Sequence, residues 1–475
     1  MKKYFLAIAS FFIYSHISLG QVYPGQMDST FVPVRSHHYD PELTFDFCVN
    51  EPAWSNQAGI HSAFGSTDRL YFRKEVPVNH DNDLSSSYST TVWRGERANA
   101  QILVWSSEAL EQVRVSTQDL RSAEGNIIPK DRITFELVRY VLSNYPYAEK
   151  KAICGESPYK SGFLMPDRFE TLDRFDLPSQ TTRPVWMMVD VPRGTVPGTY
   201  KGQVEVRAKG KAPQLLNLEI VVQNQLLPYP KDWKYRLDLW QNPWAVAWYN
   251  HVEPWSPEHK MLLKQHLKHY ADAGGTYITT YGVHSPWSDN SYMIEGGMIE
   301  WIKKADGTWA FDYKIFDEYV ELAMECGIDE AITLYTPIPW GFRHRYKDEA
   351  TGDYSYINWA PSSEEFKKMW NIFLTDFKFH LEAKSWLDIT YIGINENPME
   401  ETLAAINVVR NHDKCWKITY AGNWHKELDG LLDDYSFLYG EEPTIAEQKA
   451  RAATGRTSTV YVCLSLIHIS EPTRL

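Results

Sequence analysis

The segment Asp388-Ile-Thr-Tyr-Ile-Gly-Ile-Asn-Glu-Asn-Pro398 decides the fold of the second half of the chain. Residues 388–394 are mostly apolar or β-branched, as in a buried strand, and Asn395, Glu396 and Asn397 follow where that strand would end. Pro398 then favours the start of a helix, because its fixed backbone angle suits the first helical position. The segment therefore predicts a strand, a short loop and a helix, with a carboxylic acid at the carboxyl end of the strand.

The same alternation of strand and helix extends to both sides of this segment. Short apolar strands separated by amphipathic helices are typical of a parallel sheet with crossover helices. The strands that we predict are one fewer than a complete (β/α)8 barrel needs, so we expect an incomplete (β/α)8 TIM-type barrel over residues 231–463. The predicted strands are 235–240, 276–281, 331–335, 388–394, 416–421, 435–439 and 457–463.

Two helices of this half have recognisable start signals. Ser256 followed by Pro257 suits an N-cap and a first helical residue, and Ser362 with Glu365 has the spacing of a capping box. In the helix after Ser362, large apolar residues recur at intervals of three and four, which predicts one apolar face against the sheet. These residues are Phe366, Met369, Trp370, Phe373, Leu374 and Phe377.

Residues 21–230 show a different pattern, with short alternating or β-branched runs and almost no helical periodicity. This pattern predicts an immunoglobulin-like β-sandwich, so the whole chain is expected to be a multidomain β plus α/β protein. The segment Pro192–Tyr200 predicts a turn into a strand, as in the hairpins of such sandwiches. The Pro-rich joint Leu226–Trp233 places the domain boundary near residue 230. The predicted strand segments are 92–93, 101–105, 112–116, 133–142, 185–191, 202–208 and 215–222.

The first twenty residues have the features of a signal peptide: Lys2 and Lys3 precede an apolar run, Phe5–Ile13, and small polar residues end at Gly20. We expect cleavage near Gly20 and export to the periplasm or the extracellular space. No cysteine lies near that point, which argues against a lipid-anchored lipoprotein, and no later stretch is apolar for long enough to insert into a membrane.

The last residues, Leu464–Leu475, can be back-translated into a sequencing-library transposon adapter read in frame. We therefore expect a non-native tail over 464–475, a native gene sequence that stops near Cys463 and a barrel that is truncated at its C-terminus.

Composition excludes several classes of partner. A net charge of −13 argues against nucleic acid, which requires clustered Lys and Arg. The five cysteines are scattered without metal-finger spacing and no Gly-rich phosphate loop follows a strand, so no metal, nucleotide or other cofactor is expected. Phe, Trp and Tyr make up 14% of the chain, and such rings suit the apolar faces of sugars. The sequence does not indicate an oligomeric state.

In barrels of this type the reacting groups come from the carboxyl ends of the strands. Glycoside cleavage needs a proton donor for the departing oxygen, and Glu396 suits that role. The alternative is a glutamate that only interacts with a helix dipole, worth about 0.3 to 1 kcal/mol. Aromatic and hydrogen-bonding residues at the other strand ends together fit a sugar pocket. These substrate-binding candidates are Trp240, His284, Tyr335, Trp340, Asn423, His425, Tyr439 and Tyr461.

A set of short motifs between Leu237 and Cys463 resembles one known family. The motifs are Leu237-Asp-Leu-Trp-Gln-Asn-Pro243, Ala271-Asp-Ala-Gly274, Trp301-Ile-Lys-Lys304, Phe311-Asp-Tyr313, Asn395-Glu-Asn-Pro-Met399, Ala421-Gly-Asn423 and His425-Lys-Glu427. They resemble glycoside hydrolase family 123, the exported β-N-acetylgalactosaminidases of gut Bacteroides-type bacteria, which carry a β-sandwich ahead of a barrel.

The resemblance implies a retaining, substrate-assisted mechanism, in which the acetamido oxygen of the substrate attacks the anomeric carbon. An Asp steadies the acetamido group and the next residue, a Glu, is the acid/base. Glu396 matches the acid/base, but Asn395 occupies the Asp position. An Asn carbonyl can still accept a hydrogen bond from the acetamido N–H, yet it cannot supply negative charge.

Two alternatives remain. The chain could be a retaining glycosidase of the large barrel clan, with Asn395-Glu396 as its acid/base motif and a nucleophilic Glu after the seventh strand lost by truncation. It could also be a glycan-binding protein that does not cleave, which the neutral Asn395 favours.

Overall fold

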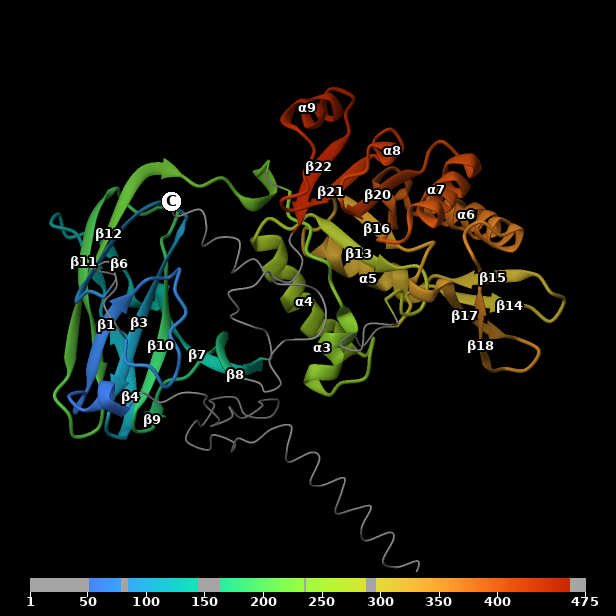
Figure 1. The fold of residues 1–475 in the computed structure, drawn as a ribbon. Coiled ribbons are helices and arrows are strands. Elements are labelled where there is room, and N and C mark those ends of the chain that lie inside the picture. Colours follow the sequence, from blue (N-terminus) through green and yellow to red (C-terminus); the bar gives the residue numbers. More distant parts are fainter. Residues whose placement is uncertain (1–50, 78–83, 144–162, 235, 288–295, 462–475) are drawn as a thin grey trace, which may run out of the picture. The chain divides into compact units, whose positions relative to one another are not determined.

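The computed structural model describes residues 51–77, 84–143, 163–234, 236–287 and 296–461 (Figure 1). The predicted signal peptide and the predicted tail lie outside these residues. The chain divides into two compact units, Met1–Leu227 and Pro228–Leu475. Each unit contains its own cluster of buried apolar side chains.

The first unit is a β-sandwich, in which two sheets share one apolar core. One sheet has the order β1-β3-β10-β7-β8 and the other β2-β12-β11-β4-β9, with β5 and β6 beside β11. Each of the seven predicted segments falls in a strand, with Val191 and Ala208 one residue beyond the strand ends, but most of the strands are longer than predicted. The strands are β1 His61–Gly65, β2 Ser87–Arg94, β3 Arg97–Ser106, β4 Leu110–Thr117, β5 Leu120–Arg121, β6 Ile127–Ile128, β7 Ile133–Ser143, β8 Phe163–Glu170, β9 Phe175–Leu177, β10 Thr181–Asp190, β11 Gly198–Arg207 and β12 Gln214–Leu226.

The segment Pro192–Tyr200 does form a turn, in which the N–H of Thr195 donates to the carbonyl of Pro192 at 3.0 Å. It is not a hairpin turn, however, because β10 belongs to one sheet and β11 to the other. The prediction of a hairpin was wrong because turn residues mark a change of direction and do not determine which sheet the next strand joins.

The core of the second unit is an open sheet of parallel strands in chain order, β13-β16-β19-β20-β21-β22, with helices in the connections (Figure 1). Its strands are β13 Tyr277–Tyr281, β16 Ala331–Tyr335, β19 Thr390–Ile394, β20 Lys417–Gly422, β21 Asp434–Leu438 and β22 Thr457–Tyr461. The helices of this unit are α3 Pro243–Asn250, α4 Pro257–Asp272, α5 Lys314–Glu325, α6 Glu364–Lys384, α7 Met399–His412, α8 Lys426–Asp429 and α9 Ile445–Ala453.

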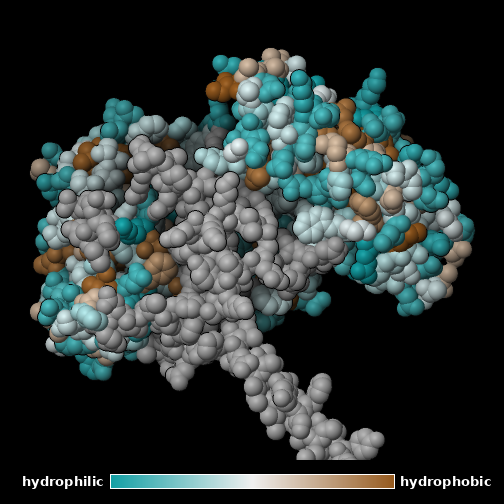
Figure 2. Space-filling model, in the orientation of Figure 1, coloured by the Kyte–Doolittle hydropathy of each residue, from teal (hydrophilic) through white to brown (hydrophobic). Residues whose placement is uncertain are grey.

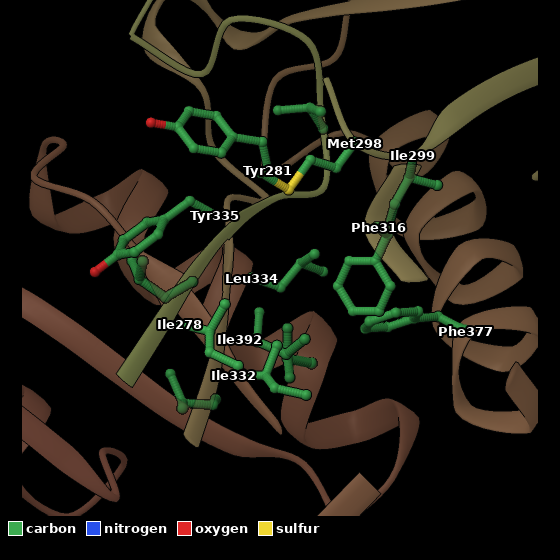
Figure 3. Packing of buried hydrophobic residues seen from close by; sticks show 14 of the residues in the cluster. Ile278, Tyr281, Met298, Ile299, Phe316, Ile332, Leu334, Tyr335, Phe377 and Ile392 are labelled. Atoms are coloured by element: carbon green, nitrogen blue, oxygen red, sulfur yellow. The ribbon is translucent and has the colours of Figure 1, made fainter. Parts of the chain in front are cut away.

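One face of this sheet is apolar and packs against helices. Figure 3 shows Ile332, Leu334 and Ile392 of the sheet close to Phe316 of α5 and Phe377 of α6. Successive side chains of a strand alternate between faces, so Thr333 and Tyr335, the residues next to Leu334, lie on the opposite face. The helix layer therefore holds the strands and leaves their other face for polar groups.

The first predicted strand, 235–240, is absent as a strand, and a closed barrel is not confirmed by the described residues. Among its described residues, 236–240, Leu237 alone forms a bridge, a parallel one to Gly275, which lies two residues before β13. An edge segment gains ladder hydrogen bonds on one side only, and Leu239 remains 55% exposed here. The bridge needs glycine, because a Cβ on Gly275 would lie 2.1 Å from the ring of Tyr270.

The helix start predicted at Ser256 is confirmed, since its hydroxyl accepts from the N–H of His259 at 3.2 Å. The capping box predicted at Ser362 is wrong by one residue. Ser363 is the N-cap of α6, and its hydroxyl accepts from the N–H of Phe366 at 3.1 Å. The six predicted apolar residues of α6 are all buried, as is Leu381.

A second, four-stranded sheet of this unit was not predicted. Its order is β15-β14-β17-β18, and its strands are β14 Glu300–Lys303, β15 Trp309–Asp312, β17 Arg343–Asp348 and β18 Tyr354–Asn358. The buried Trp301 and His344 attach one of its faces to the core of the unit.

The surface of the second unit that is visible in Figure 2 is mostly hydrophilic, with hydrophobic residues in small separate areas. No helix within the described ranges is long and apolar enough to cross a membrane. Cys326 is buried and Cys415 exposed, and both are free thiols; the other cysteines lie outside the described residues.

Candidate active site

Three aromatic rings lie together where β13 and β16 end. Trp240 stacks on Trp287 with ring centroids 5.4 Å apart, and its ring lies 4.7 Å from that of Tyr335. Trp240 is 46% exposed, whereas Trp287 and Tyr335 are buried. The Gln241 side chain fixes this segment to β13, because its oxygen accepts from the N–H of Thr279 at 2.8 Å. A partly exposed indole is thus held on a rigid support, to which the apolar face of a sugar can bind.

The ring of Tyr335 lies across the neighbouring strand β19. Tyr335 is registered opposite Gly393, and a Cβ on Gly393 would lie 2.8 Å from the tyrosine ring. Burial raises the pKa of Tyr335 well above its ordinary value, so its hydroxyl stays protonated. The peptide bond from Tyr335 to Thr336 is cis. Gly393 therefore leaves room for the Tyr335 ring over β19.

Asn395 is buried directly after β19, with only 2% of its surface exposed. Its Oδ1 accepts from the Thr336 hydroxyl at 3.1 Å and from the Asn397 amide at 3.3 Å. Its Nδ2 has no hydrogen-bond partner among the residues that the structure describes. The reverse orientation would place two amide nitrogens, both donors, against each other. The surroundings of Asn395 therefore offer two donors to its Oδ1 and no acceptor in the described residues to its Nδ2.

Glu396, the next residue, is exposed at the rim of the sheet. Its Oε1 accepts from the hydroxyl of Tyr461, the last residue of β22, at 2.8 Å. Burial, with a smaller contribution from the negative charge of Glu396, raises the pKa of Tyr420 to about 12. The carboxylate is thus held by one tyrosine and is open to solvent. A group that exchanges protons with a ligand and with water needs this access.

His284 and Trp340 lie in the loops after β13 and β16. Burial lowers the pKa of His284 to about 4, and the positive charges of Arg345 and Arg343 act in the same direction. Its imidazole is therefore neutral near pH 7. The backbone N–H of Trp340 donates to the carbonyl of Pro286 at 2.8 Å, which joins the two loops.

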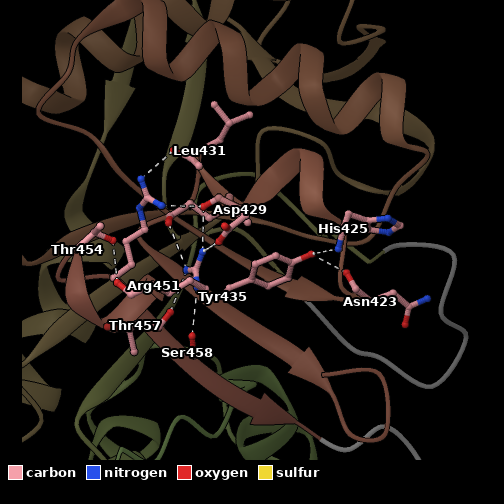
Figure 4. A network of polar contacts seen from close by, with 12 residues as sticks. Asn423, His425, Asp429, Leu431, Tyr435, Arg451, Thr454, Thr457 and Ser458 are labelled. Atoms are coloured by element: carbon pink, nitrogen blue, oxygen red, sulfur yellow. Dashed lines mark hydrogen bonds and ion pairs between the residues drawn. The ribbon is translucent and has the colours of Figure 1, made fainter. Parts of the chain in front are cut away.

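Asn423, His425 and Tyr439 follow the strands β20 and β21. The Tyr435 hydroxyl donates to the carbonyl of Asn423 at 2.6 Å and accepts from the N–H of His425 at 2.9 Å (Figure 4). The N–H of Tyr439 donates to the carbonyl of Tyr461 at 2.9 Å, and its side chain is 45% exposed. Their backbones are fixed, but no hydrogen bond joins these side chains to Glu396 in the described part of the chain.

The structure thus connects Trp240, Tyr335, Asn395, Glu396 and Tyr461 in one row across the strand ends. His284 and Trp340 lie beside this row, in the loops after β13 and β16. Asn423, His425 and Tyr439 follow β20 and β21, the two strands that lie between β19, which carries Glu396, and β22, which carries Tyr461. Sequence reasoning gave no role to Thr336 or Tyr420. A signal existed for Thr336, a polar residue directly after a buried strand, but none for Tyr420, which lies within a predicted strand.

No group of three or more His, Cys, Asp or Glu that could hold a metal ion occurs among the described residues.

Two sequence models of one family match the chain. The glycoside hydrolase 123 catalytic domain matches residues 240–470, and the glycoside hydrolase 123 N-terminal domain matches residues 64–208. None of the curated proteins matches.

Among solved structures, the chain is similar to a family 123 glycoside hydrolase from Clostridium perfringens, whose structural analysis concerned glycolipid glycan hydrolysis. The two are 25% identical with a TM-score of 0.76, over 86% of this chain and 73% of the other. A family 39 glycoside hydrolase from the gut symbiont Bacteroides cellulosilyticus is 13% identical over 70% of this chain and 56% of the other. Its TM-score of 0.25 is too low to indicate a shared fold. The two family matches and the Clostridium structure agree, and the chain belongs to glycoside hydrolase family 123.

Proposed function

We propose that this protein is exported and removes terminal β-linked N-acetylgalactosamine from glycans with retention of configuration. The observation that carries the proposal is the position of Glu396, a solvent-accessible carboxylate that accepts a hydrogen bond from Tyr461 and directly follows the buried amide of Asn395. Membership of the family supports hydrolysis of a glycosidic bond.

In the proposed first step, the acetamido oxygen of the substrate attacks the anomeric carbon. The bond to the leaving oxygen breaks, and that oxygen takes the proton of Glu396. The product is a bicyclic oxazolinium ion and a free alcohol. In the second step Glu396 accepts a proton from water, which attacks the anomeric carbon and reopens the ring, so the configuration is retained.

Asn395 is proposed to contact the acetamido group during these steps. Its Oδ1 already accepts two hydrogen bonds, from Thr336 and Asn397, and its Nδ2 has no partner. A neutral amide gives the positive oxazolinium less electrostatic stabilisation than a carboxylate would, so turnover is expected to be slow.

The decisive experiment is Glu396→Gln, assayed on an alkyl β-N-acetylgalactosaminide whose poor leaving group needs protonation. Glutamine cannot donate the proton, so kcat/KM is expected to fall by about 10²- to 10⁴-fold. Glu400→Gln is the matched control, because Glu400 is an exposed glutamate in the first turn of α7. If Glu396→Gln keeps most of the activity, Glu396 is not the acid/base.

A second candidate function is glycan binding without cleavage, which the neutral Asn395 favours. Calorimetry that detects sugar binding, without product after long incubation, would support it. The barrel-clan mechanism gains no support from the described residues, because its nucleophile would follow β22, Thr457–Tyr461, and would lie outside them.

A further inference from the structure

Beside the candidate site, β17 and β18 form a hairpin with cations and tyrosines on one face. Arg345 is registered opposite Tyr356, and Lys347 opposite Tyr354. Because side chains alternate along a strand, Arg343, Arg345 and Lys347 lie on the same face as these tyrosines. We call these five residues the Arg–Tyr face.

The cations and rings of the Arg–Tyr face stack in pairs. The Arg343 guanidinium carbon lies 3.7 Å from the centroid of the Tyr356 ring, and that of Arg345 lies 4.2 Å from the Tyr354 ring. Tyr354 and Tyr356 are 51% and 48% exposed. A guanidinium whose flat face stacks on an aromatic ring keeps the N–H groups at its edge available to bind a ligand.

The face carries an excess of positive charge, although the whole chain has a net charge of −13. Arg345 has one acidic neighbour, Glu300, at 3.8 Å, and Glu300 also accepts from the Tyr354 hydroxyl at 2.9 Å. Neither Arg343 nor Lys347 forms an ion pair within the ranges that the structure describes. These two charges are therefore available to an external anion.

The Arg–Tyr face lies close to the candidate active site. Arg343, the first residue of β17, comes three residues after Trp340, whose N–H donates to the carbonyl of Pro286 at 2.8 Å. Pro286 lies two residues after His284, so the hairpin begins at the loops that carry these two candidate residues. The positive charges of Arg343 and Arg345 also lower the pKa of His284. A ligand bound at the strand ends can therefore extend onto this hairpin.

We propose that the Arg–Tyr face is a subsite for a hexuronic acid, the sugar from which the terminal N-acetylgalactosamine is removed. The inference rests on the proposed function, because it concerns the leaving group of that reaction. The fork of Arg343 matches the planar carboxylate, which can accept two parallel hydrogen bonds. The exposed tyrosine rings suit the apolar face of the same sugar.

The test compares two trisaccharides that differ in one group. Both carry a terminal β-linked N-acetylgalactosamine; the next sugar is glucuronic acid in one and its carboxyl-reduced form, glucose, in the other. At low salt, kcat/KM is expected to be about tenfold higher for the glucuronic acid substrate, the size of one charge-assisted hydrogen bond. At 1 M salt the ratio is expected to approach one, because the Debye length falls to about 3 Å.

Arg343→Gln is expected to bring the ratio of the two kcat/KM values close to one. Arg207→Gln, which alters an exposed arginine of the β-sandwich, is the matched control and should leave the ratio unchanged. If wild-type protein cleaves both substrates with equal kcat/KM, the subsite is excluded while the proposed function stands. If wild-type protein cleaves neither trisaccharide, the proposed function fails. Calorimetry then tests the subsite separately. Equal binding of the two trisaccharides, or no binding of either, would overturn the subsite.

Discussion

At the scale of single residues, the site combines a neutral amide with surroundings that suit a carboxylate. Thr336 and Asn397 both donate to the Oδ1 of Asn395, while its Nδ2 is buried and finds no acceptor within the described ranges. An unpaired buried donor costs about 1 to 3 kcal/mol. A carboxylate at position 395 would remove that cost, because it has no donor to leave unpaired.

We therefore predict that Asn395→Asp raises kcat on β-N-acetylgalactosaminides by at least about tenfold, since a negative charge stabilises the oxazolinium ion. The control substrate is the β-galactoside with the same leaving group, which lacks the acetamido group and should gain nothing. Steady-state kinetics on the two substrates check this. An unchanged rate on the acetamido substrate would count against neighbouring-group chemistry.

A second prediction concerns Tyr461, whose hydroxyl donates to Glu396. Tyr461→Phe keeps the ring and removes the hydrogen bond, so Glu396 is held less firmly. We expect kcat to fall by about fivefold, in line with about 1 kcal/mol for one hydrogen bond. Tyr439→Phe is the control, because only the backbone of Tyr439 is bonded to β22. Equal kcat values for the two variants would show that the Tyr461 hydroxyl does not position Glu396.

At the scale of elements, the four-stranded sheet contains a histidine that must stay neutral. The Nδ1 of His344 donates to the carbonyl of Phe342 at 3.0 Å, and its Nε2 accepts from the indole N–H of Trp370 at 3.2 Å. Protonation would place two N–H donors against each other. Burial lowers the pKa of His344 to about 4.

Because the folded pKa lies below the unfolded value of about 6.5, His344 contributes stability that is fully present above pH 6.5 and is lost as the pH falls towards 4. The loss amounts to about 3 kcal/mol. In His344→Gln, the free energy of unfolding, measured by denaturant titration between pH 7 and 4, should therefore fall less steeply. Some acid sensitivity will remain, because burial also lowers the pKa of His259. An unaltered slope would contradict this.

Helices and strands could be predicted from the sequence where the local pattern of residues determines them. They could not be predicted where pairing with residues far away in the chain determines them. The apolar face of α6 and the strand β16 follow from local periodicity, and both are confirmed. The segment 235–240 has the composition of a strand but only one bridge, because a strand also needs a neighbour to pair with. The site shows the same limit. Glu396 could be selected from its position after a strand, whereas the unpaired amide of Asn395 depends on Thr336, 59 residues away in the chain.

At the scale of the whole molecule, two units with separate cores imply two separable contributions to stability. Arg451 of α9 is 1% exposed, forms an ion pair with Asp429 at 2.6 Å and donates to the carbonyls of Leu432 and Thr457 (Figure 4). Val204 of β11 is fully buried in the core of the first unit.

We predict that Arg451→Met destabilises the second unit by about 3 to 5 kcal/mol, because it leaves a carboxylate and carbonyls without their donor. Val204→Ala should destabilise the first unit by about 2 kcal/mol. Differential scanning calorimetry is expected to show a different transition shifted in each variant. A single transition that both substitutions shift equally would show that the units unfold as one.

The hydrogen bond between Tyr461 and Glu396 joins residues that are 65 positions apart. During synthesis the ribosome therefore completes the loop that carries Glu396 long before the residue that orients it leaves the exit tunnel. Glu396 acquires the geometry described above only when β22 docks, so the arrangement proposed for proton transfer forms late in the folding of this sheet.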